Sequence, residues 1–293
     1  MQTIFSTSYR LYRRHFARFL KSKPMYPLTR AANHFLLRAV FPRMRKKSVT
    51  IDDHFILLDP RDSLRLSVYG VYEPFESQLI QQETNPGSVV VDIGANIGYY
   101  TLMLARRVGE SGRVFAFEPD PTNFALLKKN VEANGYRNVV LEQKAVSNAT
   151  GKLKLYMSDE SAGDHRIYDT GDARRMIEIE AITLDDYFAQ QGIAVNCIKM
   201  DIQGAEWVAL QGMSALLSQT GHVKLFMEYW PSGLKRFGAD PKAVLQFLQE
   251  HDFALHHIDE WQETVAPITP AGIFDTLAVR RVNHVNLMCI KTV

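Results

Sequence analysis

The middle of the chain, residues 89–258, alternates between short apolar runs and stretches with helical periodicity. The apolar runs have the length of buried strands and lie at residues 89–93, 114–117, 139–141, 197–200 and 223–227. The stretches with an apolar residue at every third or fourth position lie at residues 99–108, 120–134, 205–217 and 242–251. Strands that alternate with helices predict an α/β fold in which a mostly parallel sheet is covered on both faces.

Two apolar runs at the end of the series, residues 253–258 and 285–290, are expected to pair as the final strands. The connection between them, residues 259–284, is long enough that we expect a functional or partly ordered loop.

An interruption of the series is also predicted. Residues 152–157 and 177–182 alternate apolar and polar side chains, which indicates a hairpin or flap inserted at about residues 150–182. Before the series, short strands are expected, for instance at residues 55–58 and 64–68.

The N-terminal segment differs from the rest in charge. Of the 34 Lys and Arg residues, 12 lie within residues 1–50, which hold none of the 32 Asp and Glu residues. Between Tyr9 and Lys21, apolar and basic side chains fall on opposite faces of a predicted helix. We interpret residues 1–48 as a basic amphipathic helical arm and residues 49–293 as one domain with a core at about 70–260.

Three roles for this arm stay open. It suits peripheral contact with an anionic inner membrane surface, packing against its own domain, or an organelle transit peptide.

The overall composition is that of an ordinary globular protein, with 46% hydrophobic and 23% charged residues. A net charge of +2 argues against a dedicated nucleic-acid partner. Cys197 and Cys289 lie in apolar runs, so buried thiols in a reducing compartment are expected. No apolar run reaches the roughly 18 residues of a membrane span, and no signal peptide is evident. A cytoplasmic location is therefore expected.

The strongest chemical signal is a glycine-rich turn between the run at 89–93 and the helix from Tyr99. In Asp92-Ile93-Gly94-Ala95-Asn96-Ile97-Gly98, the glycines permit a tight turn before a helix N-terminus. The spacing is not the G-x-G-x-x-G of dinucleotide sites. A carboxylate at Asp92 would repel a pyrophosphate and attract a cation, such as the ammonium or sulfonium group of S-adenosylmethionine. We therefore expect Asp92, Gly94, Asn96 and Gly98 to bind that cofactor.

Two later strand ends extend the same predicted site. Glu118 follows the second strand, 20 positions after Gly98, where a carboxylate can accept hydrogen bonds from both ribose hydroxyls. After the third strand, the backbone near Lys144 and Ala145 is expected to lie beside the adenine.

Four segments together resemble the FkbM-type methyltransferases: Val91–Gly98, Phe117–Pro119, Lys144–Ser147 and Ile198–Glu206. The resemblance implies a Rossmann-like class I methyltransferase fold, with a mostly parallel seven-stranded sheet and an antiparallel final strand. It also implies S-adenosylmethionine as methyl donor and O-methylation of a hydroxyl on a sugar, a glycoconjugate or a natural product. Gln203 stands where the family usually has glutamate, so no charge is expected there.

Methylation of a hydroxyl requires a base, because the neutral hydroxyl is a weak nucleophile. Asp201, at the end of the fourth strand, is the first candidate, and Lys199 on the same strand face would tune it or bind an acidic substrate. His165 in the inserted loop and Glu228 at the end of the fifth strand are further candidates. Glu206 suits either catalysis or simple stabilisation of a helix N-terminus.

No metal is expected, because Asp201, Glu228 and His165 lack a recognisable ligand spacing. Three other functions remain as alternatives: a nucleic-acid methyltransferase that uses the basic arm, a non-catalytic scaffold, and a dehydrogenase. The residues after the fourth strand, Asp201-Ile202-Gln203-Gly204, differ from the Asn/Asp-Pro-Pro-aromatic segment typical of base methylation, and the glycine spacing disfavours a dehydrogenase.

Overall fold

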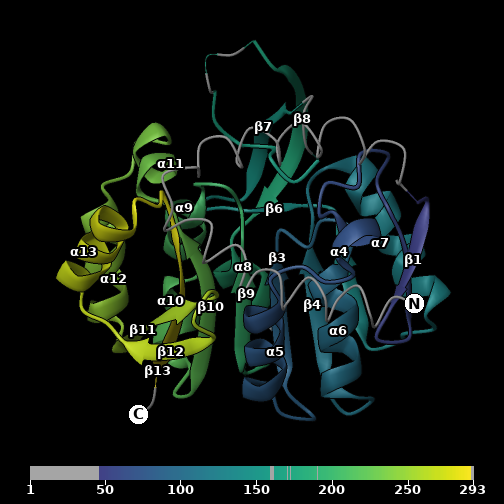
Figure 1. Ribbon diagram of the computed structural model, residues 1–293, viewed down its shortest axis with the longest axis horizontal. Coiled ribbons are helices and arrows are strands. Elements are labelled where there is room, and N and C mark those ends of the chain that lie inside the picture. Colours follow the sequence, from purple (N-terminus) through teal and green to yellow (C-terminus); the bar gives the residue numbers. More distant parts are fainter. Residues whose placement is uncertain (1–45, 159–161, 170, 172, 190, 292–293) are drawn as a thin grey trace, which may run out of the picture.

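A computed structural model describes residues 46–158, 162–169, 171, 173–189 and 191–291. Eight strands of this part of the chain form the main sheet (Figure 1). Their order across the sheet is β12 (Thr264–Pro267), β11 (Phe253–Asp259), β13 (Val285–Lys291), β10 (Val223–Tyr229), β9 (Cys197–Met200), β3 (Val89–Ile93), β4 (Arg113–Phe117) and β5 (Val139–Glu142).

Five neighbouring strands, from β10 to β5, pair in parallel, and β13 runs antiparallel between β10 and β11. This is the predicted class I methyltransferase arrangement. The expected pair of final strands is confirmed. The sheet differs from the expected seven strands because β12 adds an antiparallel edge strand to β11.

Alternate residues of the central strands face two different cores. Val91 and Ile198 face a core shared with the later helices, whereas Val90 and Cys197 face a core shared with the earlier helices. The earlier helices are α5 (Pro74–Glu83), α6 (Tyr99–Val108) and α7 (Pro121–Ala133). The later helices are α8 (Leu184–Phe188), α9 (Glu206–Gln211), α10 (Ser214–Gln219), α11 (Pro231–Arg236), α12 (Pro241–Glu250) and α13 (Pro270–Arg280). The sheet is thus covered on both faces, as its apolar strands require.

The inserted hairpin is present as a separate small sheet. β7 (Gly151–Met157) pairs antiparallel with β8 (Arg175–Ile182), and β8 pairs in parallel with β6 (Ala145–Val146). These strands bury their own small core, which includes Leu155 and Ile179. The hairpin, which we call the flap, rises beyond the main sheet at the top of Figure 1.

Three local predictions were wrong. Residues 64–68 are not a strand but lead into the short helix α4 (Leu66–Tyr69), because the Asp62 carboxylate accepts hydrogen bonds from the N–H groups of Leu66 and Ser67. The helix expected over 205–217 is two helices, α9 and α10. The expected loop at 259–284 contains β12 and α13.

The break between α9 and α10 has a packing cause. It falls at Gly212, where a Cβ atom would lie 1.9 Å from the carbonyl oxygen of Ser147. The backbone at this point therefore packs directly on the segment that leads into the flap.

The N-terminal arm at residues 1–48 falls almost wholly outside the described residues, so its three possible roles stay predictions. Within the described residues, none of the helices has the length and apolar content needed to cross a bilayer. β1 (Ser48–Ile51) and β2 (His54–Leu57) form an antiparallel hairpin beside α7.

Two asparagines of α7 hold this hairpin through matched pairs of hydrogen bonds. Asn130 accepts from the N–H of Leu57 and donates to its carbonyl, and Asn134 does the same with Phe55 one turn later. Asn130 is fully buried and also donates to the carbonyl of Ile97 in the glycine-rich turn (2.7 Å). Asn134 is partly exposed.

We expect Asn130→Ala to lower the free energy of unfolding by about 2–3 kcal/mol, because it leaves buried backbone groups without partners. Asn134→Ala is the matched control and should cost less than about 1 kcal/mol, since water can replace its bonds. Urea denaturation of both variants measures the difference. Equal losses of unfolding free energy in the two variants would show that the burial of Asn130 does not increase its contribution to stability.

Candidate functional site

The glycine-rich turn follows β3 and packs against the loop that follows β9. Gly94 has φ +82° and Gly98, the N-cap of α6, has φ +96°. A Cβ atom at Gly94 would lie 2.3 Å from the carbonyl oxygen of Asp201, so only glycine fits there. The N–H groups of Gly94 and Ala95 both donate to the carbonyl of Phe117 (3.0 Å), which ties the turn to β4.

Asp92 lies at the base of this turn, 2% exposed, and accepts a hydrogen bond from the Thr101 hydroxyl (2.6 Å). It is the register partner of Lys199 on the neighbouring strand, so the two side chains share one sheet face. Burial raises the pKa of Asp92 to about 6, against the opposing effects of Thr101 and Lys199. A positively charged ligand beside Asp92 would relieve this cost of burying a carboxylate.

Glu118, 5% exposed, follows β4 and is oriented by two backbone donors. Its Oε2 accepts from the N–H of Asn96 (2.8 Å) and its Oε1 from the N–H of Asp120 (2.9 Å). Burial raises its pKa to about 7. Each oxygen keeps one further acceptor position, so the carboxylate fits a ligand that presents two neighbouring hydroxyl groups.

A cavity that we call the strand-end pocket lies at the carboxyl ends of β3, β4 and β9. Its lining includes Asn96, Glu118, Asn123, Ala145, His165 and Asp201. The Oδ1 atom of Asn123 is buried without a hydrogen-bond partner, which leaves an acceptor available in this wall. The predicted cofactor residues Gly94, Asn96, Glu118 and Ala145 all line this one pocket.

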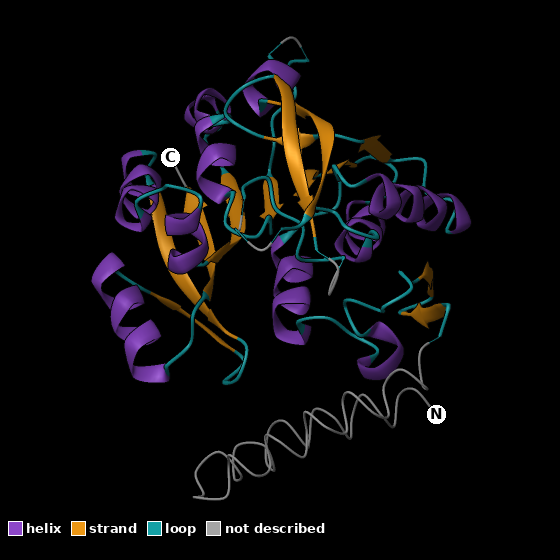
Figure 2. Ribbon diagram, turned by 90° about the horizontal axis from the view of Figure 1, so that it is seen from above, coloured by secondary structure: helices purple, strands orange, loops and turns teal. Residues whose placement is uncertain are grey.

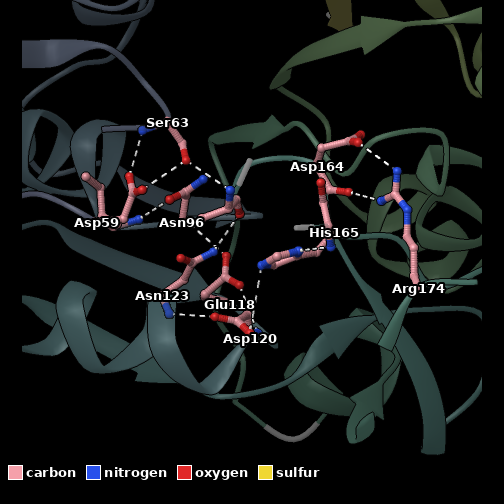
Figure 3. Close-up of polar contacts among 12 residues, drawn as sticks. Asp59, Ser63, Asn96, Glu118, Asp120, Asn123, Asp164, His165 and Arg174 are labelled. Carbon is pink, nitrogen blue, oxygen red and sulfur yellow. Dashed lines mark hydrogen bonds and ion pairs between the residues drawn. The ribbon is translucent and has the colours of Figure 1, made fainter. Parts of the chain in front are cut away.

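The described part of the flap loop covers this pocket from one side (Figure 3). The N–H of Ala162 donates to the Ser63 hydroxyl (2.9 Å), and the amide of Asn123 donates to the carbonyl of Ala162 (2.9 Å). Asp164 forms ion pairs with Arg166 (2.6 Å) and Arg174 (2.9 Å).

The structure places His165 on this covering loop, beside Asp120. Its Nδ1 accepts from the N–H of Ser158 (2.9 Å), so Nε2 faces the Asp120 carboxylate, 4.0 Å away. Burial lowers the pKa of His165, partly opposed by Asp120. Because Nδ1 is already an acceptor, this histidine serves better to hold the loop over the pocket than to remove a proton from a substrate.

A second cavity, which we call the tyrosine chamber, shares the turn residues and Asp201 with the strand-end pocket and has about 430 Å³ of free space. Its lining includes Tyr72, Asp92, Tyr99, Tyr100, Lys199 and Asp201. Asp201, the first predicted catalytic residue, therefore lies at the border of two cavities, where its Oδ1 accepts from the Gln203 amide (2.9 Å).

Lys199, 2% exposed, is buried among carboxylates. Its ammonium lies 3.3 Å from Glu76 and 5.1 Å from the centre of the Tyr100 ring. Burial alone would lower the pKa of Lys199, but Glu76, Asp201 and Glu73 outweigh it and hold the pKa above its ordinary value. Lys199 is thus a fixed positive charge and not a proton acceptor.

Sequence reasoning missed Glu73 and Glu76, the two glutamates beside this lysine. Both lie at the N-terminus of α5, in Glu73-Pro74-Phe75-Glu76, a pattern typical of an ordinary helix start. Pro74 signals the helix, but nothing in the local sequence indicates that the helix brings two carboxylates against β9.

The other two predicted acids are Glu206 and Glu228, of which the first is fully buried and the second partly buried. Glu206 is fully buried and accepts from the N–H groups of Ile202 (3.3 Å) and Gly204 (3.2 Å), so it shapes the loop after β9. Burial raises the pKa of Glu206 to about 7. Burial also raises the pKa of Glu228, whose Oε1 lies 3.7 Å from the Nδ1 of His284.

A third cavity, which we call the outer chamber, adjoins the tyrosine chamber at Ser63, Leu64 and Tyr72 and has about 570 Å³ of free space. Its lining includes Arg65, Glu73, Trp261, Arg280, His284 and Asn286. Trp261, Arg280 and His284 come from the segment at residues 259–284 that was expected to be a loop.

Among the described residues, no group of three or more His, Cys, Asp or Glu side chains has the arrangement of a metal site.

Comparisons with known proteins agree with this site. Residues 92–255 match the family model described as the methyltransferase FkbM domain. The chain is 27% identical over 176 residues to the hexuronic acid methyltransferase AglP of Haloferax volcanii, covering 59% of this chain and 66% of AglP. It is 28% identical over 164 residues to the 31-O-demethyl-FK506 methyltransferase FkbM of Streptomyces tacrolimicus, covering 45% of this chain and 61% of FkbM. Each match spans less than two thirds of the relative's length.

Among solved structures, a SAM-dependent O-methyltransferase of Thermotoga maritima is 14% identical, with a TM-score of 0.44 over 84% of this chain and 77% of that chain. The family model itself covers more than half of the chain and includes the turn at Gly94, Glu118 and the loop after β9. The chain belongs to the FkbM methyltransferase family, whose methyl donor is S-adenosylmethionine.

Proposed function

We propose that this methyltransferase acts on a hydroxyl group of a sugar, a glycoconjugate or a related natural product. The observation that carries the proposal is the row of three adjoining cavities, which offers a nucleoside site at one end and a separate chamber at the other. The names of two relatives support this acceptor class, since one acts on hexuronic acid and the other on 31-O-demethyl-FK506.

The donor fits the first two cavities by the chemistry of their walls. Glu118 would accept hydrogen bonds from the two ribose hydroxyls, and the backbone at Ala145 would lie beside the adenine. Asp92 would balance positive charge at the methionine end. When bound, the donor supplies a methyl group already activated by a positive sulfur.

The acceptor would enter from the outer chamber. Trp261 and Tyr72 provide flat surfaces of the kind that cover sugar rings, and Arg65 provides hydrogen-bond donors. Asp201 borders the donor cavities, so we assign it the position nearest the reacting atoms.

Transfer is best tested with donor labelled in its methyl group and a fractionated extract of glycolipids and polysaccharides. We expect label in a product that survives mild alkali, because a methyl ether resists the hydrolysis that cleaves a methyl ester. Label released by alkali would mean that a carboxylate is the acceptor. In a parallel incubation with total RNA and DNA we expect no label, and label made soluble there by nucleases would favour the nucleic-acid alternative.

Glu118→Gln should weaken binding of S-adenosylhomocysteine roughly 10- to 100-fold, because an ionised acceptor of two hydroxyl groups becomes a neutral amide. Glu142→Gln is the control, since Glu142 ends the neighbouring strand β5 but bonds Lys144 and Tyr187 instead. Calorimetry measures both. If the unchanged chain binds no S-adenosylhomocysteine, the scaffold alternative gains support.

The same residue should give this binding a pH dependence. Glu118 has a raised pKa of about 7 and binds the ligand as a carboxylate, so affinity should fall as the pH decreases below about 7. The fall should approach tenfold per pH unit, and the step near pH 7 should be absent in Glu118→Gln. If the affinity of Glu118→Gln still falls below about pH 7, Glu118 is not the cause of the pH dependence.

Asp201→Ala should retain affinity for S-adenosylhomocysteine and lose turnover roughly 100-fold or more, since the residue contacts the reacting atoms and not the adenosyl group. Calorimetry together with the labelled-methyl assay checks both parts. Turnover close to that of the unchanged chain would remove Asp201 from the catalytic residues.

A further inference from the structure

We propose that Glu73 is the general base that takes the proton from the acceptor hydroxyl; this role rests on the O-methylation proposed above. Glu73 lines the outer chamber, whereas Asp201 lines the strand-end pocket and the tyrosine chamber. A general base must contact the acceptor, so the carboxylate on the acceptor's side is the better placed of the two.

The Glu73 carboxylate also reaches the boundary of the tyrosine chamber. Its Oε2 accepts from the hydroxyl of Tyr100 (3.0 Å), which lines that chamber, and its Oε1 accepts from the amide of Asn286 (3.2 Å). Both donors are neutral, and the nearby ammonium of Lys199 is closest to Glu76 (3.3 Å). Glu73 is therefore held in place while each oxygen keeps an acceptor position for a substrate hydroxyl.

The backbone at Glu73 supports a functional role. Its φ is +40° and its ψ is +69°, a left-handed conformation that costs energy for a residue other than glycine. Glu73 occupies the N-cap position of α5, yet its side chain forms no capping bond. Glu260 caps this helix instead, because its two oxygens accept from the N–H groups of Phe75 (3.1 Å) and Glu76 (3.0 Å).

The capping of α5 by Glu260 determines where the Glu73 side chain lies. An N-cap side chain normally folds back on its own helix to satisfy a free N–H group. Because Glu260 satisfies two of these groups from another part of the chain, the Glu73 carboxylate is released toward the cavities.

The surroundings of Glu73 also give it suitable basicity. Burial and the neighbouring Glu76 raise its pKa to about 7, the Asp201 charge acts in the same direction, and Lys199 and Asn286 oppose it. The other titratable groups that interact with it are the hydroxyls of Tyr72, Tyr99 and Tyr100 and the carboxyl group of Glu228, which itself lies beside His284. A base with a pKa near the working pH is efficient in proton removal.

In the proposed step, the acceptor oxygen forms a bond to the methyl carbon as the bond from that carbon to sulfur breaks. The hydroxyl proton passes to a carboxylate oxygen of Glu73, and the electron pair of the broken bond stays on sulfur. Glu73 is partly exposed in the outer chamber, so the proton can afterwards leave to solvent.

The test compares Glu73→Gln with the unchanged full chain on the acceptor fraction that gives alkali-stable product. We expect kcat to fall roughly 10²- to 10⁴-fold, while affinity for S-adenosylhomocysteine changes less than about threefold. The assay uses a saturating donor concentration, at which Glu118 is already bound to the donor and its titration no longer affects the rate. Under this condition kcat of the unchanged chain should rise with pH to a plateau above about 7. That rise should be absent from the residual activity of Glu73→Gln and retained in Asp201→Ala.

Glu83→Gln is the matched control, because Glu83 ends the same helix and pairs with the partly exposed Lys224 (2.6 Å). It should keep kcat within about twofold. Glu73→Asp, which keeps the carboxylate, should recover part of the loss and restore the rise with pH.

Three results would overturn the assignment, and they differ from failure of the proposed function. Glu73→Gln with kcat near that of the unchanged chain, or with an unaltered pH profile, would exclude Glu73 as the base. Loss of S-adenosylhomocysteine binding in that variant would make Glu73 a structural residue. If the unchanged chain forms no alkali-stable methyl product, the O-methylation proposal fails first and this inference with it.

Discussion

The ammonium of Lys199 is buried beside Glu76 and among the carboxylates of Glu73, Asp92 and Asp201, which come from three different parts of the chain. One cation cannot neutralise this many acids, and burial raises the pKa values of Asp92 to about 6 and of Glu73 to about 7. A site with surplus negative charge favours a ligand that brings positive charge. The methyl donor of this family has both an ammonium and a sulfonium group.

The arrangement follows from the period of the central strands. Asp92 and Lys199 are register partners on β3 and β9, and Glu228 and Asn286 are register partners on β10 and β13. Strand side chains alternate between the two faces of a sheet, so these four residues lie on the face that α5 and α6 cover. They meet the N-terminus of α5 at the carboxyl ends of the parallel strands. Apolar packing over the rest of that face fixes these polar groups in place.

Two backbone contacts, one at the glycine-rich turn and one at the base of the flap, fix the segments that surround the cavities. Gly94 packs against the carbonyl of Asp201, and Gly212 packs against the carbonyl of Ser147 at the base of the flap. Neither contact leaves room for a side chain. The strand-end pocket is therefore bounded by main chain on one side and by the flap loop, tied to Ser63 and Asn123, on the other (Figure 3). Seen from above, helices lie on both sides of the strands of the main sheet (Figure 2).

The sequence alone determined the alternating fold, because buried strands and amphipathic helices impose local periods that do not depend on partners. It also indicated the turn at Gly94 and the strand-end acids Asp92 and Glu118, since these lie beside recognisable strands. It did not indicate β12, which pairs with the preceding strand β11, or α13, although Thr269 caps that helix and Pro270 begins it. It also did not indicate the two-helix break at Gly212, where packing against the distant carbonyl of Ser147 overrides the local pattern. Nor could it identify Glu73, because the release of that side chain depends on Glu260, more than 180 residues later in the chain. Only the tertiary structure brings those two glutamates to one helix end, since a contact between distant residues leaves no periodic signal in the sequence.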